Sequence, residues 1–205
     1  METNARSWAF DPQANNPFAH PRGWLGRFAG RIMRWTNKQD AVLDLLDVRP
    51  GDHVLEVGYG PGELIRLLSH RTDASRISGV DPSPAMRDLA ARRNRSAVRS
   101  GRVRLLVGSA EQLDLPDAGV DRVVAVNNVA IWPDLDAGVR ELGRVVRPGG
   151  TVVIAWHGGT SSSRIAERMR LPDDKLRRIE ETLRNQFADV TRRQLARLDV
   201  FVATS

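Results

Sequence analysis

The hydrophobic and polar positions of the chain follow two patterns, and the change between them falls at Pro50-Gly51. Beyond this point, short apolar runs alternate with stretches whose apolar residues recur every three or four positions. The first pattern is typical of buried strands and the second of amphipathic helices. We expect strands at 53–57, 76–80, 103–107, 121–126, 151–156, 190–194 and 199–203, helices at 63–69, 83–95 and 172–185, and a further helix from Asp134 to the stop signal Pro148-Gly149-Gly150.

The alternation of strands and helices predicts an α/β fold, in which helices cover both faces of a mostly parallel sheet. The last two strands are joined by only a few residues, whereas a parallel crossover needs about a dozen. We therefore expect a Rossmann-like, seven-stranded, mostly parallel sheet whose last strand runs antiparallel. Asp40, Ser83 and Asp134 are residue types that cap helix N-termini, and we expect each of them to do so.

Residues 1–40 precede the alternating pattern, and residues 41–205 form the domain that contains it. The first twenty residues show no periodicity and are expected to form an extended arm. In 22–35, apolar residues recur at helical spacing beside four arginines. Such a helix can lie on a membrane surface, but a lid over the site of the following domain is the preferred interpretation.

Composition excludes several classes of function. The chain has no cysteine, which excludes disulfides, thiolate catalysis and cysteine-ligated metal, and we expect no metal site. There is no apolar run of roughly 18 residues and no secretory signal, so we expect a cytoplasmic protein without stable membrane insertion. The net charge of +6 raises nucleic acid as a partner. Of the seven arginines in 87–104, however, three fall at the start of the third strand, opposite the expected active edge, so we do not expect a nucleic-acid partner.

A glycine-rich turn joins the first strand to its helix, with Gly58, Gly60 and Gly62 at alternate positions. Glycines permit a tight turn and a close approach of a ligand, although a simple connection would also use them. The G-x-G-x-G spacing differs from the G-x-G-x-x-G of dinucleotide-binding folds. Glu56 precedes the loop, where its carboxylate would repel a pyrophosphate but attract a cofactor that carries an ammonium group. Asp81 ends the second strand, where a carboxylate can accept hydrogen bonds from both hydroxyls of a ribose.

These segments resemble the motifs of a known family. Residues 56–62 and Asp81 resemble the first two motifs of class I S-adenosylmethionine-dependent methyltransferases, and 108–113 resembles the third. The segments 121–132 and 145–151 resemble the strand-four motif and the connection into strand five. Within the family, the chain most resembles small enzymes of ubiquinone and menaquinone biosynthesis. The resemblance implies an enzyme that uses S-adenosylmethionine to methylate a small-molecule acceptor. The cofactor-binding residues that it implies are Glu56, Gly58, Tyr59, Gly60, Gly62, Asp81, Pro82, Ser109, Ala110, Glu111, Asn127 and Asn128.

Two departures from the family pattern bear on the chemistry. Many members carry aspartate where this chain has Ser109, and no Asn-Pro-Pro-aromatic signature follows the fourth strand, which argues against methylation of adenine or glutamine amino groups. His157 follows the fifth strand and could accept a proton from a hydroxyl acceptor, or it could be a loop residue without a catalytic part. An RNA methyltransferase and a non-catalytic S-adenosylmethionine-binding partner protein are the alternatives, and the sequence leaves the oligomeric state open.

Overall fold

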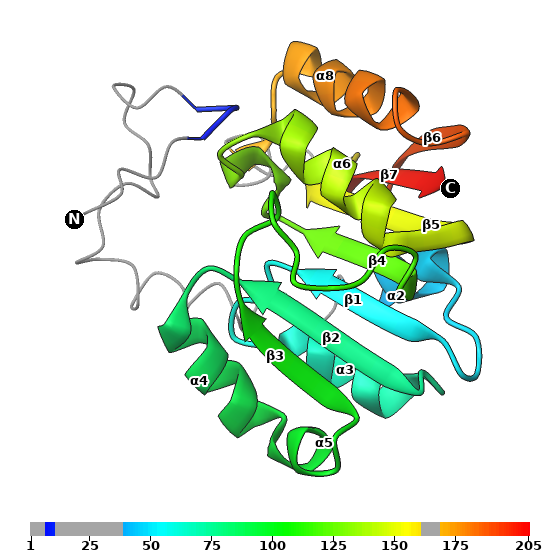
Figure 1. Ribbon diagram of the computed structural model, residues 1–205. Coiled ribbons are helices and arrows are strands. Elements are labelled where there is room, and N and C mark those ends of the chain that lie inside the picture. The colour runs from blue at the N-terminus through cyan, green and yellow to red at the C-terminus, as the bar shows by residue number, and fades with distance from the viewer. Residues whose placement is uncertain (1–6, 11–38, 161–168) are drawn as a thin grey trace.

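The computed structural model describes residues 7–10, 39–160 and 169–205 of the chain (Figure 1). The strands in these residues are β1 (His53–Val57), β2 (Arg76–Asp81), β3 (Val103–Val107), β4 (Val120–Val126), β5 (Val146–His157), β6 (Asp189–Gln194) and β7 (Leu198–Thr204). They form one seven-stranded sheet in the order β3-β2-β1-β4-β5-β7-β6. Neighbours from β3 to β5 pair in parallel, whereas β7 runs antiparallel to both β5 and β6. The predicted Rossmann-like sheet and its closing hairpin are therefore confirmed.

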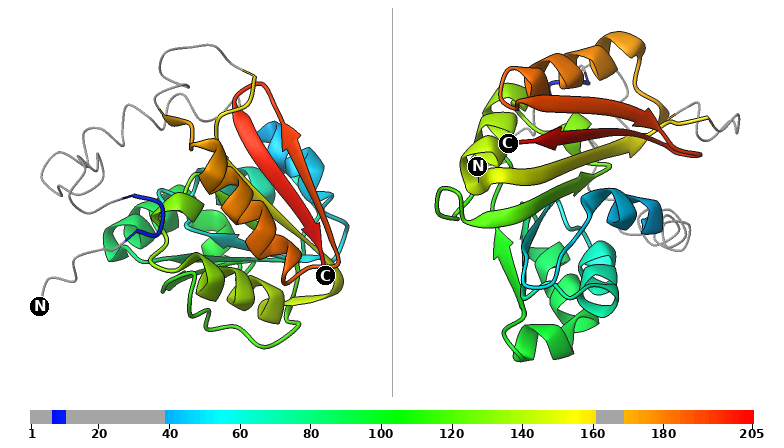
Figure 2. Two further views of the ribbon diagram at one scale, coloured as in Figure 1. Left: turned by 90° about the horizontal axis from the view of Figure 1, so that it is seen from above. Right: turned by 90° about the vertical axis from the view of Figure 1, so that its right-hand side faces the viewer.

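Helices cover both faces of this sheet, which Figure 2 shows from two further sides. The helices of one layer share an apolar core with the sheet, and they are α2 (Asp40–Leu46), α3 (Glu63–Arg71), α4 (Pro84–Arg93) and α5 (Arg95–Arg99). A second core joins the opposite face to α6 (Leu135–Val145), α8 (Asp173–Arg184) and a single 3-10 turn, η3 (Val129–Ile131). The prediction of helices on both faces is confirmed.

Strand residues alternate between these two cores. In β5, Ile154 and Trp156 belong to the core on the α6 side, while Val153 and Ala155 belong to the core on the α3 side. Complete burial of one large apolar side chain contributes about 1.5–3 kcal/mol relative to leaving it exposed. Packing on both faces fixes the parallel strands so that their carboxyl ends meet at one edge, the left-hand edge in Figure 1.

Capping residues explain where several helices begin. Ser83 and Asp134 accept hydrogen bonds from the backbone N–H groups of Met86 (3.3 Å) and Ala137 (2.9 Å), so both predicted N-caps are confirmed. The prediction for Asp40 is wrong, because α2 begins at Asp40 itself and the residue before it makes no side-chain cap bond.

The helix predicted at 83–95 is two helices, α4 and α5. The side-chain amide of Asn94 donates to the carbonyl oxygens of Ala90 (2.9 Å) and Gly62 (3.0 Å), which ends α4 and ties it to the glycine turn. Strand five is longer than predicted, since β5 starts at Val146, where it already pairs with β4.

The predicted lid helix at 22–35 and most of the arm lie outside the described residues, and the division of the chain at residue 40 stays a prediction. Ser7–Phe10 is the described part of the arm, and it is bonded to the turn that follows β4. Among the helices that the structure describes, none is both long and apolar enough to traverse a bilayer.

Candidate active site

The loop between β1 and α3 is packed on its inner side and open at its tip. Gly58 and Gly60 have left-handed backbone conformations, with φ angles of 71° and 51°. The backbone N–H of Gly58 donates to the carbonyl oxygen of Val80 (2.7 Å), and a side chain at this position would collide with Asn128. Around Gly60, in contrast, no described atom lies within 4 Å of the place that a Cβ would take. A ligand can therefore approach the backbone at Gly60.

The carboxylate of Asp81, at the end of β2, holds this loop in place. Its Oδ2 atom accepts a hydrogen bond from the backbone N–H of Gly60 (2.8 Å), and its Oδ1 atom accepts one from Ser83 (2.9 Å). Burial raises the pKa of Asp81, while these two hydrogen bonds act in the opposite direction. Each carboxylate oxygen has a further lone pair, so Asp81 can accept additional hydrogen bonds from a ligand.

Glu56 is a second buried carboxylate, on the neighbouring strand β1. It pairs in register with Gly79 of β2 and is only 3% exposed. Burial, and then the charge of Asp81, raise the pKa of Glu56 well above its ordinary value, against a hydrogen bond from the backbone of Ile65. Within the described residues the Oε2 atom of Glu56 has no hydrogen-bond partner. The anionic form of this carboxylate lacks a partner for its buried negative charge, and a cationic group of a ligand would supply that partner.

Tyr59 lies in the loop, but its side chain turns beneath it. The side chain is 3% exposed, and its hydroxyl donates to the carbonyl oxygen of Leu106 on β3 (3.1 Å). The ring passes over Gly79, where an added Cβ would lie 2.6 Å from it. Sequence reasoning did not predict this contact, and the glycine inside strand β2 was the available signal, because it marks a close approach.

The two asparagines that follow β4 differ in their surroundings. The side-chain amide of Asn128 donates to the carbonyl oxygen of Val57 (2.7 Å), and its Oδ1 atom accepts from the indole N–H of Trp132 (2.9 Å). Asn127 has a left-handed backbone with a φ of 56°, and its buried Oδ1 atom has no partner among the described residues. Asn128 therefore holds the turn against β1, while the amide oxygen of Asn127 is left without a hydrogen bond from the described residues.

The segment that follows β3 lies at the carboxyl edge of the sheet, beside the end of β2. The backbone N–H of Gly108 donates to the carbonyl oxygen of Asp81 (3.2 Å), which places Ser109 and the buried Ala110 next to the end of β2. Glu111 accepts a hydrogen bond from the backbone N–H of Asp134 (3.3 Å), the cap of α6. The exposed Pro82, the residue after Asp81, lies at the end of β2 as well.

His157 is the last residue of β5 and is 8% exposed, with its ring edge-on to Trp156 at 5.8 Å between centroids. The loop after it is fixed by Asp199, a fully buried residue of β7, whose Oδ2 atom accepts from the backbone N–H of Gly159 (3.2 Å). Asp199 was missed by sequence reasoning, although an acid within the otherwise apolar run of 198–203 is a usable signal.

Comparisons with known proteins agree with this arrangement. Residues 54–150 match the family described as a methyltransferase domain. The chain is 38% identical over 128 residues to the uncharacterized methyltransferase YdaC of Bacillus subtilis, an alignment that covers 62% of this chain and 68% of YdaC. It is 32% identical over 117 residues to the ubiquinone/menaquinone biosynthesis C-methyltransferase UbiE of Caulobacter sp. strain K31, covering 55% of this chain and 46% of that enzyme. An S-adenosylmethionine-dependent methyltransferase from Aquifex aeolicus has the same fold, with a TM-score of 0.67 at 19% identity, over 81% of this chain and 88% of the other.

The strand order, the open glycine loop and the relationship to YdaC define the class of protein. The chain belongs to the S-adenosylmethionine-dependent methyltransferases, and S-adenosylmethionine is its cofactor. The resemblance inferred from the motifs, including the likeness to enzymes of ubiquinone and menaquinone biosynthesis, is confirmed.

Proposed function

We propose that the protein transfers the methyl group of S-adenosylmethionine to a small-molecule acceptor at the carboxyl ends of β1, β4 and β5. The observation that carries the proposal is the open backbone at Gly60 between two buried carboxylates, Glu56 and Asp81. The cofactor supplies an electrophilic methyl carbon, to which the acceptor forms a bond while the carbon–sulfur bond breaks. Such a displacement depends mainly on close placement of the two reactants.

In this proposal each carboxylate holds one end of the cofactor. Asp81 accepts hydrogen bonds from the ribose hydroxyls with the lone pairs that Gly60 and Ser83 leave available. Glu56 stands below the loop and stabilises the ammonium group of the methionine part. Ser109, Ala110 and Glu111 line the adenine, and Asn127 contributes its amide oxygen near the sulfonium.

Replacement of Asn127 and Asn128 should separate ligand binding from stability. Asn127→Gly keeps the left-handed backbone accessible and removes the amide, so we expect binding of S-adenosylhomocysteine to weaken about 2- to 12-fold, the equivalent of about 0.5–1.5 kcal/mol for one hydrogen bond. Asn128→Ala leaves the carbonyl of Val57 and the indole of Trp132 unpaired, so we expect it to lower the free energy of unfolding by about 1–3 kcal/mol. Calorimetry and thermal unfolding measure the two effects, and an unchanged affinity in Asn127→Gly would remove this residue from the cofactor site.

Glu56 should give the protein a characteristic dependence on pH. Because its pKa is raised in the folded state, folded protein keeps a proton that unfolded protein loses above the ordinary glutamate pKa of about 4.3. The free energy of unfolding should therefore fall as pH rises from there toward the raised pKa. We expect Glu56→Gln to remove most of this decrease in the free energy of unfolding. The remaining decrease should come from Asp81, whose pKa is also raised.

The same group should link cofactor binding to pH. An ammonium group favours the anionic form of Glu56, so binding should release a proton and become tighter as pH rises. Urea denaturation and calorimetry at several pH values, with wild type and Glu56→Gln side by side, provide the measurement. Identical pH slopes in the two proteins would contradict this role for Glu56.

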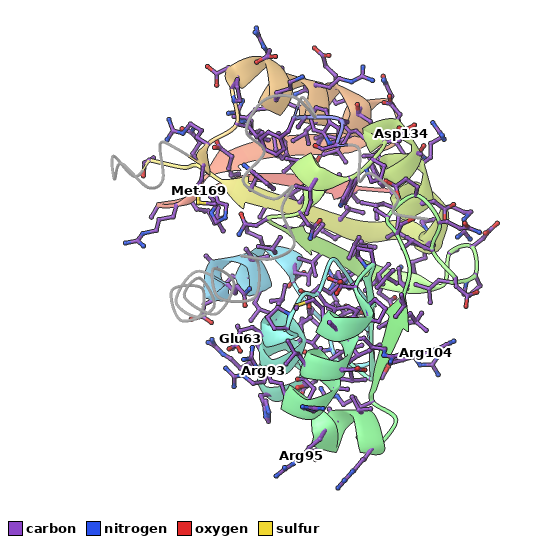
Figure 3. All side chains as sticks on the ribbon, turned by 90° about the vertical axis from the view of Figure 1, so that its left-hand side faces the viewer. Glu63, Arg93, Arg95, Arg104, Asp134 and Met169 are labelled. Atoms are coloured by element: carbon purple, nitrogen blue, oxygen red, sulfur yellow. The ribbon has the colours of Figure 1, made fainter. Side chains whose placement is uncertain are left out.

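The arginines of 87–104 support a small-molecule acceptor over RNA. The guanidinium of Arg102 donates hydrogen bonds to three backbone carbonyl oxygens at and beyond the end of α3, at 2.6–2.9 Å. Arg93 forms an ion pair with Glu63 (3.2 Å). Figure 3 looks onto the carboxyl edge and shows Arg95 and Arg104 at the end of the molecule formed by α5 and β3. This end lies away from β4 and β5, where we place methyl transfer.

A comparison of acceptors tests the proposal directly. The protein is incubated with S-adenosylmethionine and either a small-molecule extract or total RNA, and methylated products are identified by mass spectrometry. We expect S-adenosylhomocysteine and a methylated small molecule in the first reaction alone. Methylated RNA would favour the RNA methyltransferase, and cofactor binding without any product would favour the non-catalytic partner protein.

A further inference from the structure

Ser7–Phe10 is held on the outer side of the turn that follows β4. The backbone N–H of Trp8 donates to the carbonyl oxygen of Trp132 (3.1 Å), and its indole N–H donates to that of Val129 (2.7 Å). The hydroxyl of Ser7 donates to the carbonyl oxygen of Ala130 (2.6 Å). Three carbonyl oxygens of one short turn thus find their donors more than 120 residues earlier in the sequence.

The segment is also tied to two other elements at this end of the sheet. The Nζ atom of Lys175, in α8, lies 5.7 Å from the ring centroid of Trp8. The ring of Phe10 lies 6.4 Å from that of Trp156, near the end of β5. Within the segment, the Ser7 hydroxyl accepts hydrogen bonds from the backbone N–H groups of Ala9 (3.3 Å) and Phe10 (3.2 Å), which fixes its bend.

The turn satisfies only part of its own backbone. The carbonyl oxygen of Val129 accepts one long bond within the turn, from the backbone N–H of Trp132 (3.4 Å), whereas those of Ala130 and Trp132 accept from Ser7 and Trp8. η3 is a single 3-10 turn, and Val129 and Ala130 are fully buried. A buried carbonyl oxygen without a hydrogen bond costs about 1–3 kcal/mol. On its inner side the same turn is held by Asn128, which accepts from the indole of Trp132 and donates to Val57 of β1.

We infer that Trp8 is a positioning residue for methyl transfer, which holds the turn at 127–132 against the glycine loop and so fixes the place of Asn127. The inference rests on the proposed function, because that function assigns Asn127 to the cofactor site. Trp8 acts through the turn and does not contact the reacting groups. Docking of Trp8 and binding of the cofactor are then coupled, and each strengthens the other by the same factor.

Two variants separate the hydrogen bond from the rest of the contact. Trp8→Phe keeps a ring beside Lys175 and removes the indole N–H, whereas Lys175→Met keeps the hydrogen bonds and removes the cation. By calorimetry, we expect Trp8→Phe to weaken binding of S-adenosylhomocysteine about 2- to 12-fold, the range of one hydrogen bond. We expect Lys175→Met to weaken binding by no more than about 2- to 5-fold, the range of an exposed cation–π contact. Equal affinity in wild type and Trp8→Phe would overturn the inference.

The indole N–H resonances provide a second readout, which a merely structural contact would not change. The chain has five tryptophans, so a ¹H–¹⁵N spectrum contains five such signals. In wild type, we expect S-adenosylhomocysteine to shift the signals of both Trp8 and Trp132, and we expect Trp8→Phe to shift that of Trp132. If the ligand binds and leaves the Trp8 signal in place, the coupling is absent and the inference fails while the proposed function stands. If wild type does not bind S-adenosylhomocysteine, both fail together.

Discussion

His157→Ala is expected to lower turnover of a hydroxyl acceptor by about 10²–10⁴-fold, the range that a positioned general base typically contributes. His157 ends β5 at the carboxyl edge, beside the turn where we place the sulfonium. It can take the proton that the acceptor hydroxyl loses as the new bond forms. Affinity for S-adenosylhomocysteine should stay near that of wild type, because the proposed cofactor contacts all come from β1 to β4. Steady-state kinetics with cofactor at saturation measure the change.

The pH–rate profile of the variant gives a further readout. Wild type should show a limb that reports the protonation of the base, and His157→Ala should lose this limb. His70 is the matched control, since it is exposed in the last turn of α3, far from the carboxyl edge. If His157→Ala turns over within a few-fold of wild type, His157 is a loop residue and the reaction proceeds by placement alone.

Asp81→Ala is expected to weaken binding of S-adenosylhomocysteine about 10- to 150-fold, which corresponds to about 1.5–3 kcal/mol for charge-assisted hydrogen bonds. Two effects combine, because the ribose hydroxyls lose their acceptor and the backbone N–H of Gly60 loses its partner at 2.8 Å. Calorimetry measures the loss. Asp88→Ala removes an exposed carboxylate paired with Arg87 and should leave affinity unchanged. Undiminished binding by Asp81→Ala would show that the ribose is held elsewhere.

Features that depend on neighbours in sequence could be predicted from the sequence. The bounds of β1 and β3 are those expected, because each apolar run is bordered by a glycine turn. The glycine loop is equally local, since the positive φ angles at Gly58 and Gly60 demand this residue type. The antiparallel last strand followed from the length of its connection alone.

Features that depend on contacts between distant residues could not be predicted in this way. The break between α4 and α5 comes from a bond of Asn94 to Gly62, and the burial of Tyr59 comes from the space over Gly79. Asn127 and Asn128 are the same residue type in adjacent positions, and only the tertiary structure shows that Asn128 holds the turn against β1 while the amide oxygen of Asn127 has no hydrogen bond from the described residues. The docking of Ser7–Phe10 likewise has no counterpart in local periodicity.

The strand order has a consequence for how copies of this protein behave toward one another in solution. Among the described residues the sheet ends in β3 on one side and β6 on the other, and an edge strand that is not covered is a template for pairing with a strand of another molecule. Both edges carry exposed arginines, Arg104 on β3 and Arg193 on β6. Like charges on these strands oppose edge-to-edge pairing of two copies, so part of the basic character of the chain acts against aggregation.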